Sequence, residues 1–259
     1  MAAGMAVTLI ALPGLPRVRA GDDVAALIGA ACARENVRLA DGDVVAIAQK
    51  IVSKAEGRTV DLKTVTPSAR AREIAARVGK DARLVEVILA ESNRVVREAP
   101  NVLIVEHRLG FVMANAGVDQ SNVGQSNVEG EDMALLLPGD PDESARQLKT
   151  DLAARAGAKL GVVVTDSFGR PWRNGVVGVA LGAAGIPALL DKRGTPDLFG
   201  RPLRVTEIAL ADEIAAAASL LMGAADEGIP VVILRGLALA GPEKPARALI
   251  RDPALDLFR

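Results

Sequence analysis

The sequence has little of several residue types on which particular functions depend. Its 259 residues include one cysteine and one histidine, which excludes a disulfide framework and a thiolate zinc site and argues against an imidazole-rich zinc site. We interpret both residues, Cys32 and His107, as structural. The scarcity of cysteine fits a reducing compartment, so we expect a cytoplasmic protein.

Long apolar runs and an excess of one charge are also missing. Pro13 and Pro16 interrupt the apolar start, and Asp212 and Glu213 interrupt the alanine-rich stretch after Thr206, so no segment predicts a membrane-spanning helix. Lys and Arg number 31 against 32 Asp and Glu, which gives no electrostatic reason to expect nucleic acid or an anionic membrane as a partner. The composition favours small ligands held by specifically placed groups.

The periodicity of apolar residues predicts a mixed α/β fold. We expect helices at residues 22–36, 67–79, 81–92, 141–156 and 207–222. We expect strands at residues 7–12, 43–48, 102–106, 110–116, 160–164, 176–181 and 230–234. Thr66, Asp140 and Thr206 are the expected N-terminal caps of three helices. Because 102–116 has the pattern of a hairpin, we expect a mixed sheet with flanking helices rather than a purely parallel one.

The length allows one large domain or two intimately packed subdomains. We assign residues 1–237 to this domain or pair of subdomains. Proline and charge increase after Ala238 while periodicity fades, so residues 238–259 are expected to form a loosely docked tail.

The most informative stretch is residues 161–182, GVVVTDSFGRPWRNGVVGVALG. A buried strand at 160–164 would deliver Asp166 and Ser167 into a glycine-rich loop that also holds Arg170, Trp172 and Arg173. Hydroxyl, carboxylate and guanidinium groups can converge there on a ligand without being buried unpaired. This layout is typical of the edge of an active site.

A second group of oxygen-bearing side chains follows the strand at 110–116. The segment NAGVDQSN places Asp119, Ser121 and Asn122 in one turn. With Asp166 and Ser167 it would form a two-carboxylate site suited to magnesium or manganese. Taken alone, the segment favours an ordinary turn over a binding site, because Asn, Gly, Asp and Ser are common turn residues.

A polar run and a stiff turn could face phosphate groups. Residues 43–58, DVVAIAQKIVSKAEGR, place Gln49, Lys50, Ser53 and Lys54 after a strand, where they face either phosphate oxygens or solvent. LPGLP at 12–16 could bring backbone amides to a ligand or simply end a strand. Neither a P-loop nor a GxGxxG motif is present, so any nucleotide is bound in another way.

Other aromatic and charged residues have two readings each. Phe168, Trp172 and Phe199 could stack on a flat heterocycle or plug loops against the core. Arginines 170, 173, 201 and 204 could clamp an anion or form surface charge. Glu207 is a candidate metal ligand or base. Its expected position in the first turn of the helix at 207–222 also has a structural explanation, because a carboxylate there complements the helix dipole.

Taken together, these segments resemble the coenzyme F420-0:L-glutamate ligase family, the γ-glutamyl ligases of deazaflavin coenzyme synthesis. The resemblance covers almost the whole chain. It rests, in order, on LPGLP at 12–16, GDVVAIAQKIVSKAEGR at 42–58, ANAGVDQSNVG at 114–124, VVTDSFGRPWRNG at 163–175 and VTEIALADEIAAAASLLMG at 205–223.

The resemblance implies a GTP-dependent ligase that activates the terminal carboxylate of the deazaflavin precursor F420-0 as an acyl phosphate. The amino group of L-glutamate then attacks, and GDP and phosphate are released. It implies two Mg²⁺ or Mn²⁺ ions per subunit, with K⁺ as a further candidate, and an intertwined homodimer with the site near the interface.

The implied site residues fall into four sets. The metal ligands would be Asp119, Asp166 and Ser167. The nucleotide contacts would be Gly14, Leu15, Pro16, Arg17, Gln49, Lys54 and Asn122. Lys54, Asp119 and Asp166 are the expected catalytic residues, and Arg170 and Arg173 would contact the substrate anion.

The chain differs from this family pattern at two positions. Gln49 stands where relatives have a small hydroxyl residue, and Ser167 stands where threonine is common. We expect the standalone form of the enzyme rather than the form fused to a nitroreductase-like domain. Two alternatives remain open: a metal-dependent amide ligase or phosphotransferase with another carboxylate acceptor, and a non-catalytic GTP-binding dimer.

Overall fold

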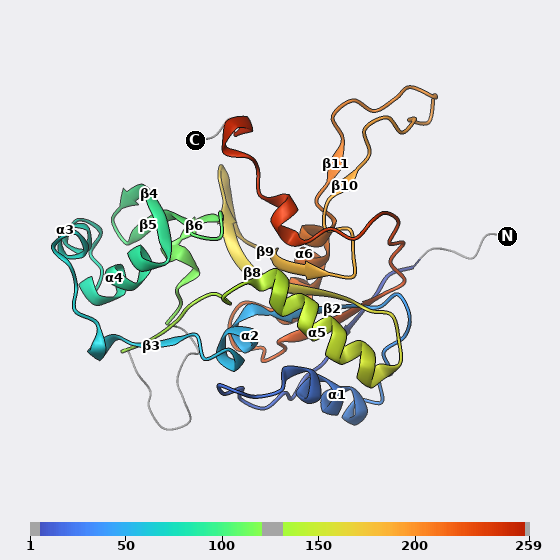
Figure 1. Cartoon of the computed structure of the whole chain (residues 1–259), viewed down its shortest axis with the longest axis horizontal. Helices are drawn as coiled ribbons and strands as arrows, with labels where there is room; N and C mark the ends of the chain where they lie inside the picture. The colour runs from blue at the N-terminus through green and yellow to red at the C-terminus, as the bar shows by residue number, and fades with distance from the viewer. Residues whose placement is uncertain (1–5, 121–131, 257–259) are drawn as a thin grey trace.

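The structure, a computed structural model, describes residues 6–120 and 132–256. Its centre is a five-stranded sheet (Figure 1) in the order β1-β12-β2-β8-β9. The strands are β1 (Thr8–Ala11), β12 (Val231–Arg235), β2 (Val44–Ala48), β8 (Gly161–Arg170) and β9 (Arg173–Ala184). Only the β2–β8 pair is parallel. The expected α/β fold with a mixed sheet is therefore confirmed.

Helices cover both faces of this sheet, because its strands bury side chains on both sides. Helices α1 (Val24–Arg34) and α5 (Pro141–Ala156) form one core with the sheet. Helix α6 (Leu210–Met222) forms the other. Asp140 caps α5 as expected, accepting a hydrogen bond from the Glu143 amide at 3.1 Å. None of the helices in the described ranges is long and apolar enough to cross a membrane.

Strand β9 changes the face on which its residues lie. Leu181 is an extra residue between the partners of Val164 and Thr165, which forms a β-bulge. Gly178, before the bulge, lies against the backbone of α6, whereas Gly182, after it, lies against the first residues of α5. Each glycine permits a helix to approach the strand where a side chain would collide.

A smaller part of the chain forms a three-stranded antiparallel sheet with two helices, beside the main sheet in Figure 1. Its elements are α3 (Ala69–Val78), α4 (Ala82–Ala90), β4 (Ser92–Ala99), β5 (Val102–His107) and β6 (Val112–Ala114), which enclose their own core. A two-stranded ribbon of β3 (Thr59–Asp61) and β7 (Met133–Leu135) connects it to the main sheet. The expected hairpin at 102–116 is the β5–β6 pair.

The remaining elements are short. Helix α2 (Gln49–Ala55) follows β2 directly. Strands β10 (Leu190–Asp191) and β11 (Glu207–Ile208) form the base of an arm, residues 190–208, that projects from the body (Figure 1). Four 3₁₀ turns lie at Leu62–Thr64, Asn115–Gly117, Ala246–Leu249 and Pro253–Leu255.

Residues after Ala238 contact the body at specific points. Ala246 is fully buried, and its amide donates to Asp142 Oδ1 at 2.7 Å. Arg247 Nε donates to the same carboxylate at 2.9 Å. These contacts hold at least this segment against the start of α5, while the division of the chain into domains stays a prediction.

Several expected boundaries were wrong. The cap of α3 is Ser68 rather than Thr66, and its hydroxyl accepts from the Ala71 amide at 3.2 Å. Thr206 does not begin a helix, because Glu207 belongs to β11 and α6 starts at Leu210. Dipole complementation in α6 therefore does not explain Glu207. Helix α2 and strand β4 were not expected, since neither has a long stretch of regular apolar spacing.

A partly buried acidic residue connects the smaller part to the main body. Glu91 lies 2.9 Å from Arg58, 3.1 Å from Arg108 and 3.5 Å from Nε2 of the buried His107. His107 Nδ1 accepts from the Leu109 amide at 2.9 Å, so Nε2 carries the proton in the neutral ring and faces Glu91. The neighbouring His107 and the two arginines lower the pKa of Glu91 to about 2.

We expect Glu91→Gln to lower the free energy of unfolding by about 2 kcal/mol at pH 7. The pKa of Glu91 in the folded protein lies below its ordinary value of 4.5. Its stabilisation is therefore complete above about pH 4.5 and is lost as the pH falls towards 2. Urea denaturation at pH 7 and pH 3 measures this, and the difference between variant and parent should shrink at the lower pH.

Glu98→Gln is the matched control. Glu98 binds an arginine through both of its carboxylate oxygens, at 2.7 and 3.0 Å from Arg77, but the Arg77 side chain is more than half exposed. Such pairs contribute at most about 1 kcal/mol. Equal losses in the two variants would contradict the special role of Glu91.

Candidate active site

The expected site residues meet where β2 and β8 end. These strands are parallel and adjacent, with Ala48 paired to Thr165, so their carboxyl ends lie at one edge of the sheet. Gln49, the first residue of α2, and Asp166 come directly after this last pair. The carboxyl ends of parallel strands are the usual place for a binding site in α/β proteins.

A strained turn positions Asp119 beside this edge. Asn115, Ala116 and Gly117 all have positive φ, between 54° and 66°, which is rare for residues with a side chain. The Asp119 amide then donates to the Leu135 carbonyl at 3.0 Å, and its carbonyl accepts from the Leu135 amide at 2.8 Å. A turn therefore lies at residues 115–117, and β7 fixes the position of Asp119 after it. Ser121 and Asn122 lie outside the described residues.

Asp119 and Asp166 interact electrostatically. Desolvation raises the pKa of Asp166 to about 6, and the charge of Asp119 adds to the rise. The Ser167 amide and the Lys50 ammonium act in the opposite direction. Lys50 Nζ lies 2.6 Å from Asp119 Oδ2. Two carboxylates thus share one site with the Lys50 ammonium, and two such carboxylates also favour a divalent ion.

A group of positive charges lies next to the acidic pair. Partial burial lowers the pKa of Lys54, and the nearby charges of Lys50 and Arg17 lower it further. Neighbouring positive charges repel one another unless an anion binds between them. The structure thus brings together cations from the segment after β1 and from α2, as a polyphosphate requires.

The LPGLP segment at residues 12–16 directly precedes Arg17, one of these cations, and is fixed to the body of the protein. Gly14 has φ of +70°, and Arg34 of α1 donates from Nη2 to the Pro13 carbonyl at 2.8 Å. Leu15 packs on the core of α1 and α5, whereas Pro16 and Arg17 are exposed. The turn is therefore fixed on the body while its outer residues remain accessible.

Gln49 is almost fully buried, and its Oε1 accepts from the Ser53 hydroxyl at 2.8 Å. The side-chain oxygen is thus used within α2. Its assignment as a nucleotide contact stays a prediction, as do the roles of the other candidate residues.

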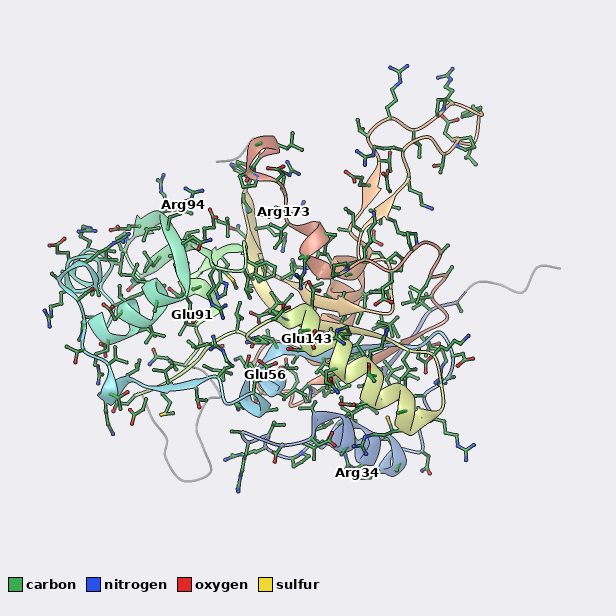
Figure 2. All side chains as sticks on the ribbon, viewed as in Figure 1. Arg34, Glu56, Glu91, Arg94, Glu143 and Arg173 are labelled. Atoms are coloured by element: carbon green, nitrogen blue, oxygen red, sulfur yellow. The ribbon has the colours of Figure 1, made fainter. Side chains whose placement is uncertain are left out.

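The segment after Asp166 is a β-hairpin and not the loop expected from its glycines. β8 continues to Arg170, which pairs with Arg173 across the two-residue turn of Pro171 and Trp172. Alternation along a strand places Asp166, Phe168 and Arg170 on one face. β8 extends to Arg170 because it pairs antiparallel with β9, and the composition did not indicate this pairing. Figure 2 shows Arg173 at the far end of this hairpin.

The face shared by Asp166 and Arg170 turns towards β6. Phe168 packs against Phe111, Met113 and Leu137, so for this residue the plug interpretation is confirmed. Arg170 Nη1 is buried and has no hydrogen-bond partner in the described ranges. Asn115 Oδ1, in the turn before Asp119, is likewise buried and has no hydrogen-bond partner among the described residues. Buried polar atoms of this kind usually have a partner, so both are candidates to contact a ligand.

The other aromatic and basic candidates are separated from this face. Trp172 is 81% exposed and Phe199 is 86% exposed, so neither plugs a loop against the core. Phe199, Arg201 and Arg204 lie on the arm at 190–208.

Sequence reasoning mentioned Lys50 only as one member of a polar run, yet it is the residue that binds Asp119. Its position directly after the end of β2 was the available signal. Among the described residues, no group of three or more His, Cys, Asp and Glu side chains is arranged to hold a metal. A metal at Asp119 and Asp166 would therefore need an oxygen of Ser167, water or substrate oxygens to complete its ligands, as Mg²⁺ commonly does.

Comparison with known proteins agrees with this arrangement. Residues 14–236 match the family described as F420-0:Gamma-glutamyl ligase. The chain is 50% identical over 248 residues to the coenzyme F420:L-glutamate ligase of Methanopyrus kandleri, covering 94% of each chain. It is 47% identical over 260 residues to the protein of that name from Methanothermobacter thermautotrophicus, covering 98% of this chain and 100% of the relative. It is 44% identical over 255 residues to the protein of that name from Archaeoglobus fulgidus, covering 98% of this chain and 97% of the relative. The chain therefore belongs to the F420-0:gamma-glutamyl ligase family.

Proposed function

We propose that this protein is a GTP-dependent ligase that joins L-glutamate to the terminal carboxylate of the deazaflavin precursor F420-0 in coenzyme F420 biosynthesis. One observation carries the proposal: the carboxylates of Asp119 and Asp166 lie beside the cations Lys50, Lys54 and Arg17. This combination suits a metal-bound nucleoside triphosphate. The description of the family supplies the acceptor F420-0, and the names of the relatives supply L-glutamate.

The reaction has two steps. An oxygen of the acceptor carboxylate attacks the γ-phosphorus of GTP, the bond to the β–γ bridging oxygen breaks, and GDP leaves. The glutamate nitrogen then attacks the acyl carbon, an amide bond forms, a proton passes to solvent, and phosphate leaves. No covalent bond to the protein is required.

The residues of the site have separate tasks in this scheme. Lys54 and Arg17 would bind phosphate oxygens, and their mutual repulsion would be relieved when the nucleotide arrives. The turn at Gly14, Leu15 and Pro16 would contact the nucleotide through backbone groups. Arg170, whose buried Nη1 has no partner among the described residues, would bind an anionic group of the acceptor.

Asp119, Asp166 and Ser167 would hold Mg²⁺ or Mn²⁺. Two neighbouring carboxylates with a raised pKa at one of them fit a divalent cation, because the ion removes their repulsion. When bound, such an ion neutralises charge on the phosphoryl oxygens during transfer. Lys50, which neutralises Asp119 in this structure, would then be available to a phosphate.

Mass spectrometry tests the proposal. The deazaflavin precursor is incubated with protein, GTP, L-glutamate and Mn²⁺, with controls that lack each component. We expect added glutamyl units that depend on GTP and on glutamate, and their number gives the length of the chain that is added. GTP consumption without a mass shift would indicate another carboxylate acceptor. Neither product nor GTP consumption would favour a non-catalytic GTP-binding dimer.

We also propose that the protein is a homodimer in which the arm at 190–208 contacts the second copy. The arm exposes Leu198 completely, Phe199 to 86% and Val205 to 85%. Apolar side chains gathered on a projecting hairpin favour a protein partner. The combined change Leu198→Ser and Phe199→Ser is expected to weaken self-association at least about tenfold.

Sedimentation velocity over a range of concentrations measures this effect. Leu220→Ser is the control, because Leu220 is 78% exposed on α6 rather than on the arm. An unchanged mass of the arm variant, or a monomeric parent protein, would contradict the proposal.

A further inference from the structure

Trp172 occupies a turn position at which the backbone conformation does not favour a tryptophan. It is the second of the two residues that connect β8 to β9, after Pro171. Proline fixes φ near −65°, and Trp172 has φ of 59°. This is the pattern of a type II turn, in which the second central residue is ordinarily glycine because φ must be positive.

The side chain is not needed for core packing either. Its exposed fraction is 81%, although it is the only tryptophan in a chain without tyrosine. Backbone strain and an exposed large aromatic ring both cost stability. Residues that combine such costs concentrate at functional sites.

The hairpin connects Trp172 to the site of reaction. Asp166 and Arg170 lie on one face of β8 and are separated by four residues, or about 13 Å at the usual rise of a strand. Trp172 follows in the turn beyond them. Arg170 and Arg173 end the two strands on either side of the turn, and the exposed Arg173 follows Trp172 directly, so the tip carries an aromatic side chain and a cation.

We infer that the hairpin tip is the acceptor-binding platform and that Trp172 stacks on the planar heterocycle of the acceptor. This inference rests on the proposed function. A deazaflavin acceptor carries its reactive carboxylate at one end of a flexible chain and its ring at the other. With the carboxylate at Asp119 and Asp166, Arg170 binds an anionic part of the chain and the ring reaches the tip.

The platform predicts that Trp172 acts on acceptor binding and not on phosphoryl transfer. Trp172→Ala should raise KM for the acceptor about tenfold, as expected for the loss of one aromatic stacking contact. KM for GTP and kcat should change less than about twofold, because the contact exists equally before and during the reaction. Trp172→Phe retains a ring and should recover most of the affinity.

A second variant separates binding from folding. Trp172→Gly removes the ring and at the same time relieves the positive φ. We expect its unfolding midpoint to equal or exceed that of the parent protein, while acceptor KM rises as in Trp172→Ala. Leu220→Ala removes an equally exposed apolar side chain from α6 and should leave acceptor KM unchanged.

Calorimetric titration with the free deazaflavin ring tests the platform without turnover. The parent protein should bind the ring, and Trp172→Ala should bind it about tenfold more weakly. If the parent forms no glutamyl product but this difference persists, the proposed function fails and the ring platform stands. If product forms normally and Trp172→Ala changes neither KM nor ring binding, the platform is overturned. A change in oligomeric state of Trp172→Ala without a change in ring affinity overturns it in favour of a protein contact.

Discussion

Asp166→Asn is expected to lower turnover by at least about a thousandfold while the protein remains folded. Asparagine keeps the shape of the side chain but removes the charge with which we propose that Asp166 binds a divalent cation. Loss of a group that stabilises charge in the transition state typically costs this much. Initial rates of GTP consumption and of glutamyl product formation measure the effect.

The fold should tolerate this substitution. The carboxylate of Asp166 is desolvated and faces the like charge of Asp119, so a neutral side chain removes an unfavourable interaction. We therefore expect a thermal unfolding midpoint at or above that of the parent protein, measured without metal. Asp151→Asn changes a carboxylate on α5 whose partner is Gln147 and should retain full activity. Normal turnover by Asp166→Asn would remove Asp166 from the site.

Gly182→Ala is expected to destabilise the protein by more than about 3 kcal/mol. A Cβ atom at this position would lie 1.9 Å from the carbonyl oxygen of Pro141. The obstacle is the backbone at the start of α5, which Asp140 and Asp142 also hold through their hydrogen bonds. Neither a rotamer change nor a small side-chain shift can remove this collision. Urea denaturation gives the change in free energy.

Gly29→Ala is the matched control. Gly29 lies within α1, and a Cβ there would meet nothing within 4 Å. Alanine is favoured over glycine inside a helix by about 0.5–1 kcal/mol, so this variant should be more stable than the parent protein. A small effect of Gly182→Ala would mean that α5 and β9 are less closely packed than the structure shows.

The sequence was sufficient to predict most of the main sheet and all but one of the α-helices. Strands such as β2 and β12 are short apolar runs between polar residues, and α5 has a clear cap in Asp140. These signals are local. Residues 165–170 were not predicted as a strand because only pairing with β9 makes them extended.

The two halves of the site could be predicted only as separate segments. Asp119 and Asp166 each follow a predicted strand, which made both candidates. Their common location depends on the order of strands in the sheet and on the strained turn at 115–117, neither of which has a periodic signal. Lys50 was not singled out for the same reason, since a lysine after a strand is usually solvated.

The order β1-β12-β2 has a consequence for the synthesis of the protein. The strand between β1 and β2 comes from residues 231–235, so these two early strands cannot pair with their neighbour until most of the chain has been translated. β2 also cannot pair with β8 until the residues from Gly161 onward have been translated. Sheets that depend on such distant pairings form slowly, and their unpaired edges are prone to aggregate meanwhile. The nascent chain should therefore depend on chaperones, and a ribosome stalled before residue 231 should carry a sheet without the strand that joins β1 to β2.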